Sequence, residues 1–580
     1  GMDMKQERCI SYLKPFTKRL IIGPIFKFIE AVFELIVPIL MALIIDEGIK
    51  KRGGDLKYIY SIGIIIIVLG ILGLASSLVC QFSASRASQG YGTLLRNAIF
   101  KKINSLSAKE LDTMGSDALV NIMTNDINQL QLAVAMLIRL VVRAPFLVLG
   151  SLVASMIINF KIGLIFLIMI ILISIVLYFI VKASSTKYTK VQSKLDDLSI
   201  VSSENLKGSR EVRGFATQEK EKERFIKEAK AYQKEALSIA KISSLLNPFT
   251  SVITNIAIIA IIYFGSKMVN RGNLLQGEVI ALVNYMNQIL LALIVVSNLV
   301  VIFTKAYASL KRCDALLSLN SSIKNGEDTD IDFDNENIIE FKNVSFAYDD
   351  ITETSIHDID FSIKKGSTIG IIGGTGSGKS TLIKLIERFY DPSLGKIYLS
   401  GKDLQEYDLK ILRKTIGLVH QKAVLFKGTI RTNLQMANSN ASDDEMKAAL
   451  RVAKAFDFVM EKGGLDAWVE ENGRNYSGGQ KQRITIAQAI VKKPNILILD
   501  DSTSALDYMT DAAVRKNIKN YSKDLTTIII SQRASSLKDA DKIIVLDDGK
   551  IEGIGTHNDL LRDCMVYQEI CSSQKEVGGE

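Results

Sequence analysis

A glycine-rich segment that ends in lysine and serine lies near the middle of the chain. Residues 373–380 read GGTGSGKS, after an apolar run at 368–372 and before a helical pattern at 381–387. In a strand, loop and helix of this kind, glycines let backbone N–H groups converge on phosphate oxygens at the positive end of the helix. Lys379 adds a positive charge for the terminal phosphates, and Ser380 offers a hydroxyl to Mg²⁺. The residues expected to hold the nucleotide phosphates are Gly373, Gly374, Thr375, Gly376, Ser377, Gly378, Lys379, Ser380 and Thr381.

A second apolar run, further along the chain, ends in a carboxylate. Residues 496–499 are Ile-Leu-Ile-Leu, and Asp500 follows them directly. A buried strand that ends in aspartate is a weak signal alone, but its place downstream of a glycine loop makes it specific. We expect Asp500 to hold Mg²⁺ through water, as the Walker B aspartate of P-loop enzymes does.

Further motifs follow one another in a fixed order. An aromatic residue, Tyr348, precedes the glycine loop, and Gln421 follows it. Residues 476–480 read YSGGQ, and residues 504–507 read SALD. This ordered series resembles the ATP-binding cassette (ABC) proteins. Over nearly its whole length the chain resembles an exporter-type half-transporter, in particular the degenerate-site subunit of bacterial heterodimeric multidrug exporters.

The resemblance implies a role for each motif. Tyr348 would stack on adenine, and Gln421 would contact Mg²⁺ together with Ser380 and Asp500. Asp507 belongs to the D-loop motif. The signature motif, which has tyrosine in place of the usual leucine, would face an ATP held by a second chain through Ser477, Gly478, Gly479 and Gln480. The resemblance therefore implies ATP and Mg²⁺ as cofactors and a dimer as the working unit.

Two positions that should carry hydrolysis depart from the family pattern. Asp501 stands where the family has a glutamate that orients the attacking water, and its side chain is one methylene shorter. Gln532 stands where the family has a histidine; the three histidines of the chain, His357, His420 and His557, lie elsewhere. A misplacement of about 1 Å costs on the order of 100-fold in rate, and glutamine cannot carry the positive charge of a histidine. These changes predict weak hydrolysis at the chain's own ATP site.

The signature motif, in contrast, is intact. A degenerate hydrolytic site beside a good signature favours a heterodimer, in which the signature completes a competent site on a different half-transporter chain. A homodimer with two slow sites is the alternative, because aspartate can act as a weak base.

The composition indicates membrane spans rather than an unusually apolar soluble core. Of the 580 residues, 48% are hydrophobic, and the excess is concentrated before residue 305. The net charge is +9. Lys and Arg crowd segments 82–132 and 182–247, which fits cytosolic loops better than a nucleic-acid surface, so no nucleic-acid partner is expected. The five cysteines show no metal-binding or disulfide spacing and are interpreted as ordinary thiols.

The sequence predicts a helical membrane domain fused to an α/β nucleotide domain. Residues 1–19 are expected to be cytosolic, 20–310 to form the membrane domain, 311–337 a linker, 338–573 a P-loop nucleotide-binding domain with a largely parallel sheet, and 574–580 a tail. Six spans are expected near 20–45, 58–81, 134–158, 162–181, 249–270 and 280–303. The protein would thus be a multi-pass protein of the cell membrane, in contact with lipid, with its nucleotide domain in the cytoplasm.

Several charged and amide side chains lie inside these spans, where they are costly and usually face protein or water. In span one, Lys27 and Glu30 form either an ion pair or part of a polar face, and Glu34 lies deeper. Arg139 is spaced to contact that acidic face or to line a cavity, as is Arg143. A substrate cavity is predicted at Glu34, Arg139, Asn284 and Asn287; ion pairing and interhelical hydrogen bonding are the alternatives.

Three classes of function use a nucleotide domain of this kind. The first is ATP-driven export of drugs, amphiphiles or lipids by one half of a dimer. The second is a non-transporting ATPase of the same superfamily, such as a DNA-repair type, which six fused spans argue against. The third is an ATP-gated sensory or regulatory membrane protein, in which a slow ATP site controls state rather than turnover. Importers are disfavoured because those of the common type keep the two domains on separate chains.

Overall fold

The structure is a computed structural model of the chain. It describes residues 8–51, 53–348, 355–502 and 505–578. The chain divides into two compact units, each of which is described by itself. The membrane unit comprises residues Gly1–Ser105 and Met114–Asn320, and the nucleotide unit comprises Leu106–Thr113 and Ser321–Glu580.

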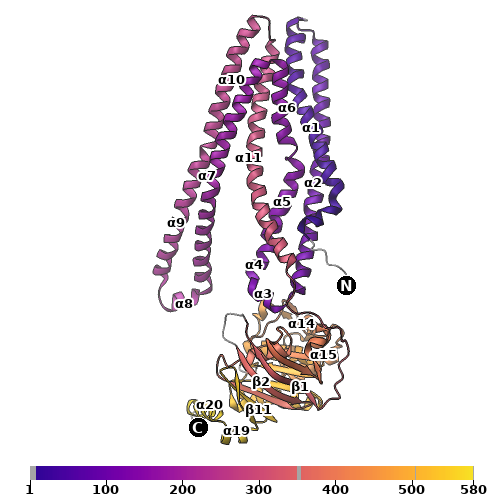
Figure 1. Ribbon diagram of the computed structural model, residues 1–580, viewed down its shortest axis with the longest axis vertical. Helices are drawn as coiled ribbons and strands as arrows, with labels where there is room; N and C mark the ends of the chain where they lie inside the picture. Colours follow the sequence, from indigo (N-terminus) through magenta and orange to yellow (C-terminus); the bar gives the residue numbers. More distant parts are fainter. Residues whose placement is uncertain (1–7, 52, 349–354, 503–504, 579–580) are drawn as a thin grey trace. The chain divides into compact units, whose positions relative to one another are not determined.

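Long helices make up the membrane unit (Figure 1). They are α1 (Thr17–Leu43), α2 (Leu56–Ser105), α4 (Ser116–Asn121), α5 (Ile127–Arg139), α6 (Arg143–Ile158), α7 (Phe160–Lys207), α8 (Ser209–Gly214), α9 (Gln218–Ser244), α10 (Leu246–Asn270) and α11 (Gln276–Ser318). A 3₁₀ segment, Cys9–Phe16, precedes α1, and π-helical turns occupy Ile44–Lys51 and Ile122–Asp126.

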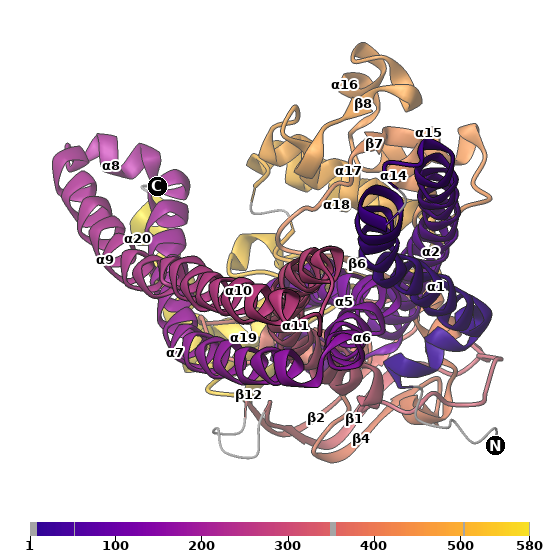
Figure 2. The same cartoon turned by 90° about the horizontal axis from the view of Figure 1, so that it is seen from above.

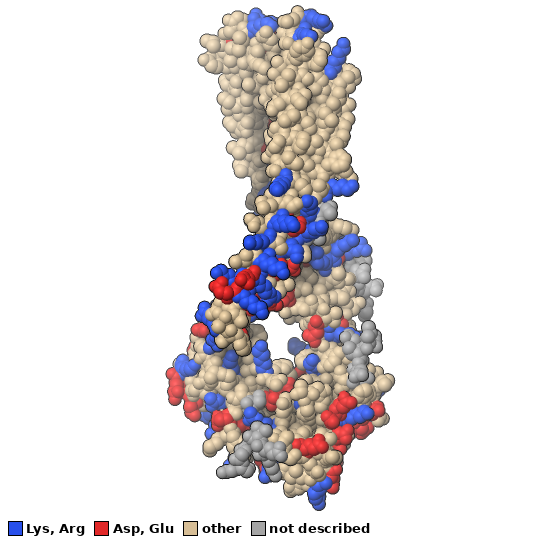
Figure 3. Space-filling model, turned by 90° about the vertical axis from the view of Figure 1, so that its left-hand side faces the viewer, with Lys and Arg blue, Asp and Glu red and all other residues tan. Residues whose placement is uncertain are grey.

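Six helical stretches among the described residues are long and apolar enough to cross a membrane, as the fold prediction required. They are Cys9–Lys51, Leu56–Ser105, Ser116–Ile158, Phe160–Ser184, Gln218–Asn270 and Gln276–Ser318. Figure 3 shows a broad belt with few charged side chains on this unit, with Lys and Arg gathered at its two ends. Such a distribution suits a hydrocarbon layer between two polar interfaces.

The helices of the membrane unit form two outer groups around a central one. Figures 1 and 2 show α1 beside α2 on one side, and α7, α9 and α10 on the other, with α8 joining α7 to α9. Helices α5, α6 and α11 lie between these groups. The third span is interrupted, because α5 ends at Arg139, Leu140–Val142 form a turn, and α6 begins at Arg143.

Two main sheets build the nucleotide unit. The larger has the strand order β12-β11-β3-β10-β9-β6, and its strands are parallel except for β12. The smaller, β2-β1-β4-β5, is antiparallel and had not been predicted, and β7 pairs with β8. The strands are β1 (Asn337–Phe346), β2 (Ile356–Lys364), β3 (Thr368–Gly373), β4 (Leu394–Leu399), β5 (Lys402–Asp403), β6 (Ile416–Val419), β7 (Gly428–Thr429), β8 (Trp468–Val469), β9 (Ile496–Asp500), β10 (Thr526–Ile530), β11 (Lys542–Asp547) and β12 (Lys550–Gly555).

The nucleotide unit also contains helices. They are α12 (Lys379–Ile386), α13 (Leu409–Thr415), α14 (Ile430–Gln435), α15 (Asp443–Val452), α16 (Phe456–Glu461), α17 (Gly478–Val491), α18 (Tyr508–Tyr521), α19 (His557–Asp563) and α20 (Met565–Gly578), with α3 (Ala108–Met114) almost wholly in the same unit. Every residue of β10 is buried, which is why its sequence is continuously apolar or threonine rather than alternating.

The parallel register gathers the predicted motifs at one edge of the sheet. Strand β9 pairs in parallel with both β6 and β10, and β10 pairs in parallel with β3. At the carboxyl ends of β6, β9, β10 and β3 lie Gln421, Asp500, Gln532 and the glycine loop, respectively. In open α/β sheets ligands bind outside the carboxyl ends of the strands, so the topology alone places these residues around one site.

Candidate nucleotide site

The glycine loop between β3 and α12 has the conformation its sequence predicts. Gly376 and Gly378 have φ of 87° and 95°, in the left-handed region that favours glycine. A Cβ on Gly378 would lie 2.6 Å from a methyl carbon of Ile356, whereas one on Gly374 or Gly376 would meet open space. The loop is therefore tight against β2 on one side and leaves its backbone accessible on the other, as phosphate binding requires.

The lysine of the loop is buried and folded back onto it. The Lys379 ammonium donates to the carbonyl oxygens of Gly373 (2.9 Å) and Gly374 (2.5 Å) and to the Ser377 hydroxyl (3.2 Å). Burial lowers the pKa of Lys379, while the charges of Asp501 and Asp500 act in the opposite direction. A phosphate would replace uncharged partners of this ammonium with charged ones and so strengthen its bonding.

Two adjacent carboxylates end β9. Burial raises the pKa of Asp500, and the neighbouring charge of Asp501 raises it further. Burial also raises the pKa of Asp501. The charges of Arg533 and Lys379 and a hydrogen bond from Gln421 partly offset this increase. The Gln421 amide donates to the Asp501 carboxylate over 3.4 Å. Asp501 thus bonds to the Gln421 amide that follows β6, and the charges of Lys379 and Arg533 act on it.

Arg533 was missed by sequence reasoning, although it directly follows the substituted position. Gln532 itself is exposed, and its backbone carbonyl accepts a hydrogen bond from the Gln574 side chain over 2.6 Å. The same amide group accepts from the backbone N–H of Ala534 over 2.9 Å. Gln574 begins the predicted tail but lies within α20, so the C-terminal helix holds the backbone on both sides of Arg533.

Tyr348 lies beside the helix that follows the glycine loop. Its hydroxyl is 3.2 Å from the Thr381 hydroxyl, and the Lys384 ammonium lies 5.0 Å from its ring centroid. Its ring packs edge-on against Tyr390, with centroids 5.3 Å apart. Tyr390 in turn donates a hydrogen bond to the carboxylate of Asp112 over 2.7 Å.

The signature segment opens α17. The Ser477 hydroxyl accepts from the backbone N–H of Gln480, and the Gln480 side chain accepts from the backbone N–H of Ser477, which is a capping box. Ser477 and Gly478 are exposed, and a Cβ on Gly478 would meet open space. Tyr476, in place of the usual leucine, is buried, and its ring lies 4.2 Å from the Lys462 ammonium. The core of the unit therefore accommodates tyrosine in place of leucine at position 476.

The comparisons with known proteins agree with this geometry. Residues 20–293 match the model of the ABC transporter transmembrane region, and residues 356–504 match the model of the ABC transporter. The chain is 35% identical to the uncharacterized ABC transporter ATP-binding protein YfiB of Bacillus subtilis, and the match covers 98% of both chains. It is 32% identical to the uncharacterized ABC transporter ATP-binding protein Rv1273c of Mycobacterium tuberculosis, again over 98% of each.

The chain belongs to the ABC transporter family. Its fold is similar to that of a bacterial Atm1-family ABC exporter solved with ATP bound, with a TM-score of 0.81 and 24% identity over 96% of this chain and 98% of that one. It is a multi-pass membrane half-transporter, with the membrane and ATPase domains on one chain, and half-transporters of this family dimerise.

The D-loop of this transporter is described in part, since Ser504 lies outside the described residues. Asp507 caps α18 by accepting from the backbone N–H of Thr510 over 3.0 Å. Hydrogen bonding to Thr510 holds the pKa of Asp507 below its usual range. A Cβ on Gly479 would lie 3.2 Å from the carbonyl oxygen of Ala505, so signature and D-loop are in close contact within the chain.

The predicted cavity residues of the transporter make different kinds of contact: some are paired with other side chains and others are exposed. The Arg143 guanidinium pairs with the Glu34 carboxylate over 2.8 Å, and the Gln288 amide donates to the Glu34 carbonyl over 3.3 Å. Arg139 donates to the Ser85 hydroxyl over 3.4 Å. Asn284 and Asn287 are exposed, and the Asn284 amide bonds back to its own helix at the Ile280 carbonyl.

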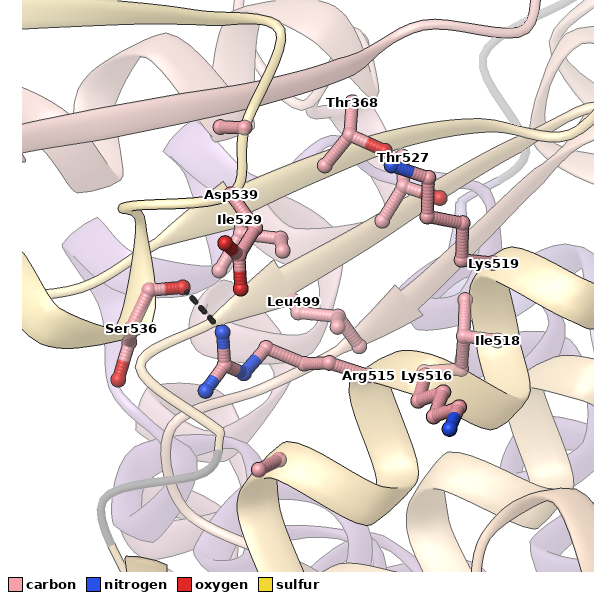
Figure 4. A pocket seen from close by; sticks show the side chains of 12 residues that line it. Thr368, Leu499, Arg515, Lys516, Ile518, Lys519, Thr527, Ile529, Ser536 and Asp539 are labelled. Carbon is pink, nitrogen blue, oxygen red and sulfur yellow. Dashed lines mark hydrogen bonds between the residues drawn. The ribbon is translucent and has the colours of Figure 1, made fainter. Parts of the chain in front are cut away.

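The nucleotide unit also has a cavity of about 470 Å³ that includes none of the predicted nucleotide ligands. It lies between α18 and β10, and Figure 4 shows the Arg515 side chain extending across it toward Ser536, whose carbonyl accepts from the guanidinium over 2.8 Å. Arg515 is also paired with the buried carboxylate of Asp511. Its charge is therefore neutralised within the fold, and the cavity has a structural explanation.

Proposed function

We propose that this chain is one half of a heterodimeric ATP-driven exporter and that it contributes a degenerate ATP site and a competent signature. The observation that carries the proposal is Asp501 at the end of β9. Its backbone N–H is bonded to the Ile530 carbonyl over 2.9 Å, and its φ is 41°. Because this backbone is held by the neighbouring strand, the shorter side chain cannot regain the reach of a glutamate by a backbone shift.

The second support is the charge of Arg533, which lowers the pKa of Asp501. A family histidine would supply a donor and, when protonated, a charge near the γ-phosphate; here the positive charge that acts on Asp501 is that of Arg533, which follows Gln532. Arginine stays protonated and can stabilise phosphate, but it cannot exchange a proton near neutral pH. The arrangement favours tight ATP binding and slow hydrolysis.

Mg²⁺ is part of the same proposal. The side chains expected to hold it are the Ser380 hydroxyl, the Gln421 amide oxygen and the Asp500 carboxylate, an all-oxygen set of the kind Mg²⁺ prefers. Their elements meet at the carboxyl edge of the sheet, and Gln421 already reaches the carboxylate pair. When bound, the ion would neutralise phosphate charge and relieve the mutual repulsion of Asp500 and Asp501.

The cargo proposed is an amphiphile, a lipid or a drug-like molecule that enters from the membrane. The ion pair between Glu34 and Arg143 argues against the simplest form of this idea, in which Glu34 attracts cationic drugs, because its carboxylate is already engaged. Exposed amides at Asn284 and Asn287 on α11 support a wet surface that tolerates varied cargo.

The first test compares ATPase activity of this chain alone in lipid with that of the chain co-expressed with its genomic neighbour. Near-zero turnover alone, rescued by the neighbour and lost when the neighbour's catalytic glutamate is changed to glutamine, supports the heterodimer. Full turnover alone would favour the homodimer.

A matched pair of substitutions in the complex sharpens the test. Ser477→Arg blocks the signature that completes the partner's site, and Lys379→Met weakens ATP binding at this chain's own loop. In a heterodimer with one competent site, Ser477→Arg should abolish ATP turnover, while Lys379→Met should lower it only several-fold. Equal losses would show two equivalent sites. Uptake of a fluorescent amphiphile into inverted vesicles then distinguishes export from an ATP-gated sensory role.

A further inference from the structure

Helices α1 and α2 bring two arginines face to face. A Cβ on Gly90 of α2 would lie 2.4 Å from the Phe16 ring, and a Cβ on Gly23 of α1 would lie 3.4 Å from Cβ of Ser83. These two close contacts fix an antiparallel register in which residue 16 lies opposite 90 and residue 23 lies opposite 83. Arg19 and Arg86 fall between them, at the same level of the two helices.

Both guanidinium groups contact a single aromatic ring. The Arg19 guanidinium carbon lies 5.2 Å from the Phe82 ring centroid, and that of Arg86 lies 5.6 Å from it. The Phe82 side chain is 56% exposed. One helical turn from Phe82, the Ser85 hydroxyl accepts from the Arg139 guanidinium of α5. Three arginines from three helices thus surround one turn of α2.

No carboxylate balances this charge within the described part of the chain. Helices α2 and α5 contain no aspartate or glutamate, and the only acids of α1 are Glu30 and Glu34. Glu30 pairs with Lys27 over 2.7 Å, and Glu34 pairs with Arg143. Among the described residues, Arg19, Arg86 and Arg139 have no ion-pair partner, and the Arg139 Nε is buried without a hydrogen-bond acceptor.

An anionic ligand would stabilise this arrangement. Like charges that face one another repel, and a cation–π contact returns only about 0.5–2 kcal/mol. Clustered arginines at the cytoplasmic end of membrane helices attract anionic headgroups. An acceptor with several oxygens and negative charge would satisfy all three guanidinium groups, because guanidinium binds phosphate through paired hydrogen bonds.

We propose that Arg19, Arg86 and Arg139 form a binding site for the phosphate headgroup of an anionic lipid. Arg19 is in the first turn of α1, at the start of the first span. Helix α2 runs from Arg86 directly into Leu106–Thr113, which belongs to the nucleotide unit, so the arginines lie toward the cytoplasmic end of the spans. Basic pockets between membrane helices on this side suit anionic headgroups, and the exposed Phe82 ring would lie against the acyl chain. The inference does not depend on the heterodimer or on the cargo.

The test uses the full-length transporter in nanodiscs of phosphatidylcholine with increasing phosphatidylglycerol. Native mass spectrometry counts retained lipid, and thermal unfolding measures stabilisation. We expect phosphatidylglycerol to be retained and to raise the unfolding midpoint. Arg86→Gln with Arg139→Gln should weaken retention by about tenfold for each arginine, the effect of one lost charge-assisted hydrogen bond. The charge-preserving double variant Arg86→Lys with Arg139→Lys should keep part of the lipid retention.

The control is Lys18→Gln, which removes one charge from the exposed neighbour of Arg19 on the same turn of α1. Equal lipid retention in the glutamine variants and the unsubstituted protein would overturn the proposal. An equal loss of lipid retention in the Lys18 variant would show that the lipid responds to general surface charge and not to these three arginines. Displacement of the lipid by inorganic phosphate at matched concentration would point to a small-anion site, and a change only in chain–chain association would assign the arginines to a partner carboxylate.

Discussion

Tyr390 donates a hydrogen bond to the Asp112 carboxylate over 2.7 Å, although 278 residues separate them in the chain. Asp112 lies in the segment that continues α2, and the Tyr390 ring packs against Tyr348, whose hydroxyl contacts Thr381 of α12. Burial and the bond to Asp112 both raise the pKa of Tyr390, so its hydroxyl stays a donor at all physiological pH values. Within the nucleotide unit, a continuous line of contacts therefore joins the segment that follows α2 in the chain to the helix after the glycine loop.

Tyr390→Phe should uncouple transport from hydrolysis. The substitution keeps the ring against Tyr348 and removes only the bond to a charged acceptor, which is worth about 1.5–3 kcal/mol. We expect ATPase activity in detergent to change by less than about twofold, while transport per ATP hydrolysed falls by about tenfold. Paired measurements in proteoliposomes check this. Asp112→Asn, which still offers an acceptor oxygen, should show a smaller defect; an equal or larger one would contradict the hydrogen-bond explanation.

Asp501→Glu should raise hydrolysis at this chain's own site. The added methylene restores the reach of the carboxylate toward the attacking water, and near-attack geometry is worth up to about 100-fold. The measurement is single-turnover hydrolysis in a complex whose partner site has been inactivated. Gln532→His is expected to add to the gain, because it restores a group that titrates near neutral pH. Asp501→Asn serves as control and should remove the residual activity; unchanged activity in both variants would show that this carboxylate takes no part.

Glu387 should make the nucleotide unit lose stability as pH rises. Its side chain is 6% exposed, and burial raises its pKa to about 7 from 4.5, with Lys492 and Arg413 acting in the opposite direction. Its Oε2 has no hydrogen-bond partner among the described residues. Below pH 4.5 both states hold the proton; between 4.5 and 7 only the unfolded state releases it, so stability falls by about 3 kcal/mol and then levels off.

The single tryptophan, Trp468, lies in the nucleotide unit and allows its unfolding to be followed by fluorescence in the full chain. Glu387→Gln should remove most of the dependence between pH 5 and 7 and stabilise the unit at pH 8. Glu445→Gln is a fitting comparison, because its carboxylate is exposed and its pKa is lowered to about 2 by Lys493. A pH profile unchanged by Glu387→Gln would contradict the prediction.

The pair between Glu34 and Arg143 should stabilise the membrane unit. The two side chains are 35% and 27% exposed, so we expect a coupling energy of about 1 kcal/mol rather than that of a fully buried pair. A double-mutant cycle of Glu34→Gln and Arg143→Gln, followed by thermal unfolding in detergent, measures it. The same cycle on Lys27 and Glu30 is the internal reference. Additive effects of the two substitutions would contradict a direct interaction.

Much of the fold follows from local patterns. Long apolar stretches could adopt only helices in a membrane, and the runs at 368–372, 496–499 and 527–530 are strands β3, β9 and β10 of the structure. The antiparallel sheet was missed because β1 and β2 carry bulges that disturb the alternation of apolar residues. The contribution of Arg533 was missed because nothing in its local sequence distinguishes it from any exposed basic residue.

The sequence by itself determined the chemistry expected of this protein: a phosphate loop, a predicted metal-binding carboxylate, an intact signature motif and two substituted positions are all read from residue type and spacing. Only the tertiary structure decided which charged side chains have an ion-pair partner. Glu34 is neutralised by an arginine 109 residues away, whereas Arg19 and Arg86 contact one ring and Arg139 bonds to a serine one helical turn from it, without a carboxylate. The reason is physical, since motif geometry depends on the local backbone, while electrostatic balance depends on helix register and packing between distant segments.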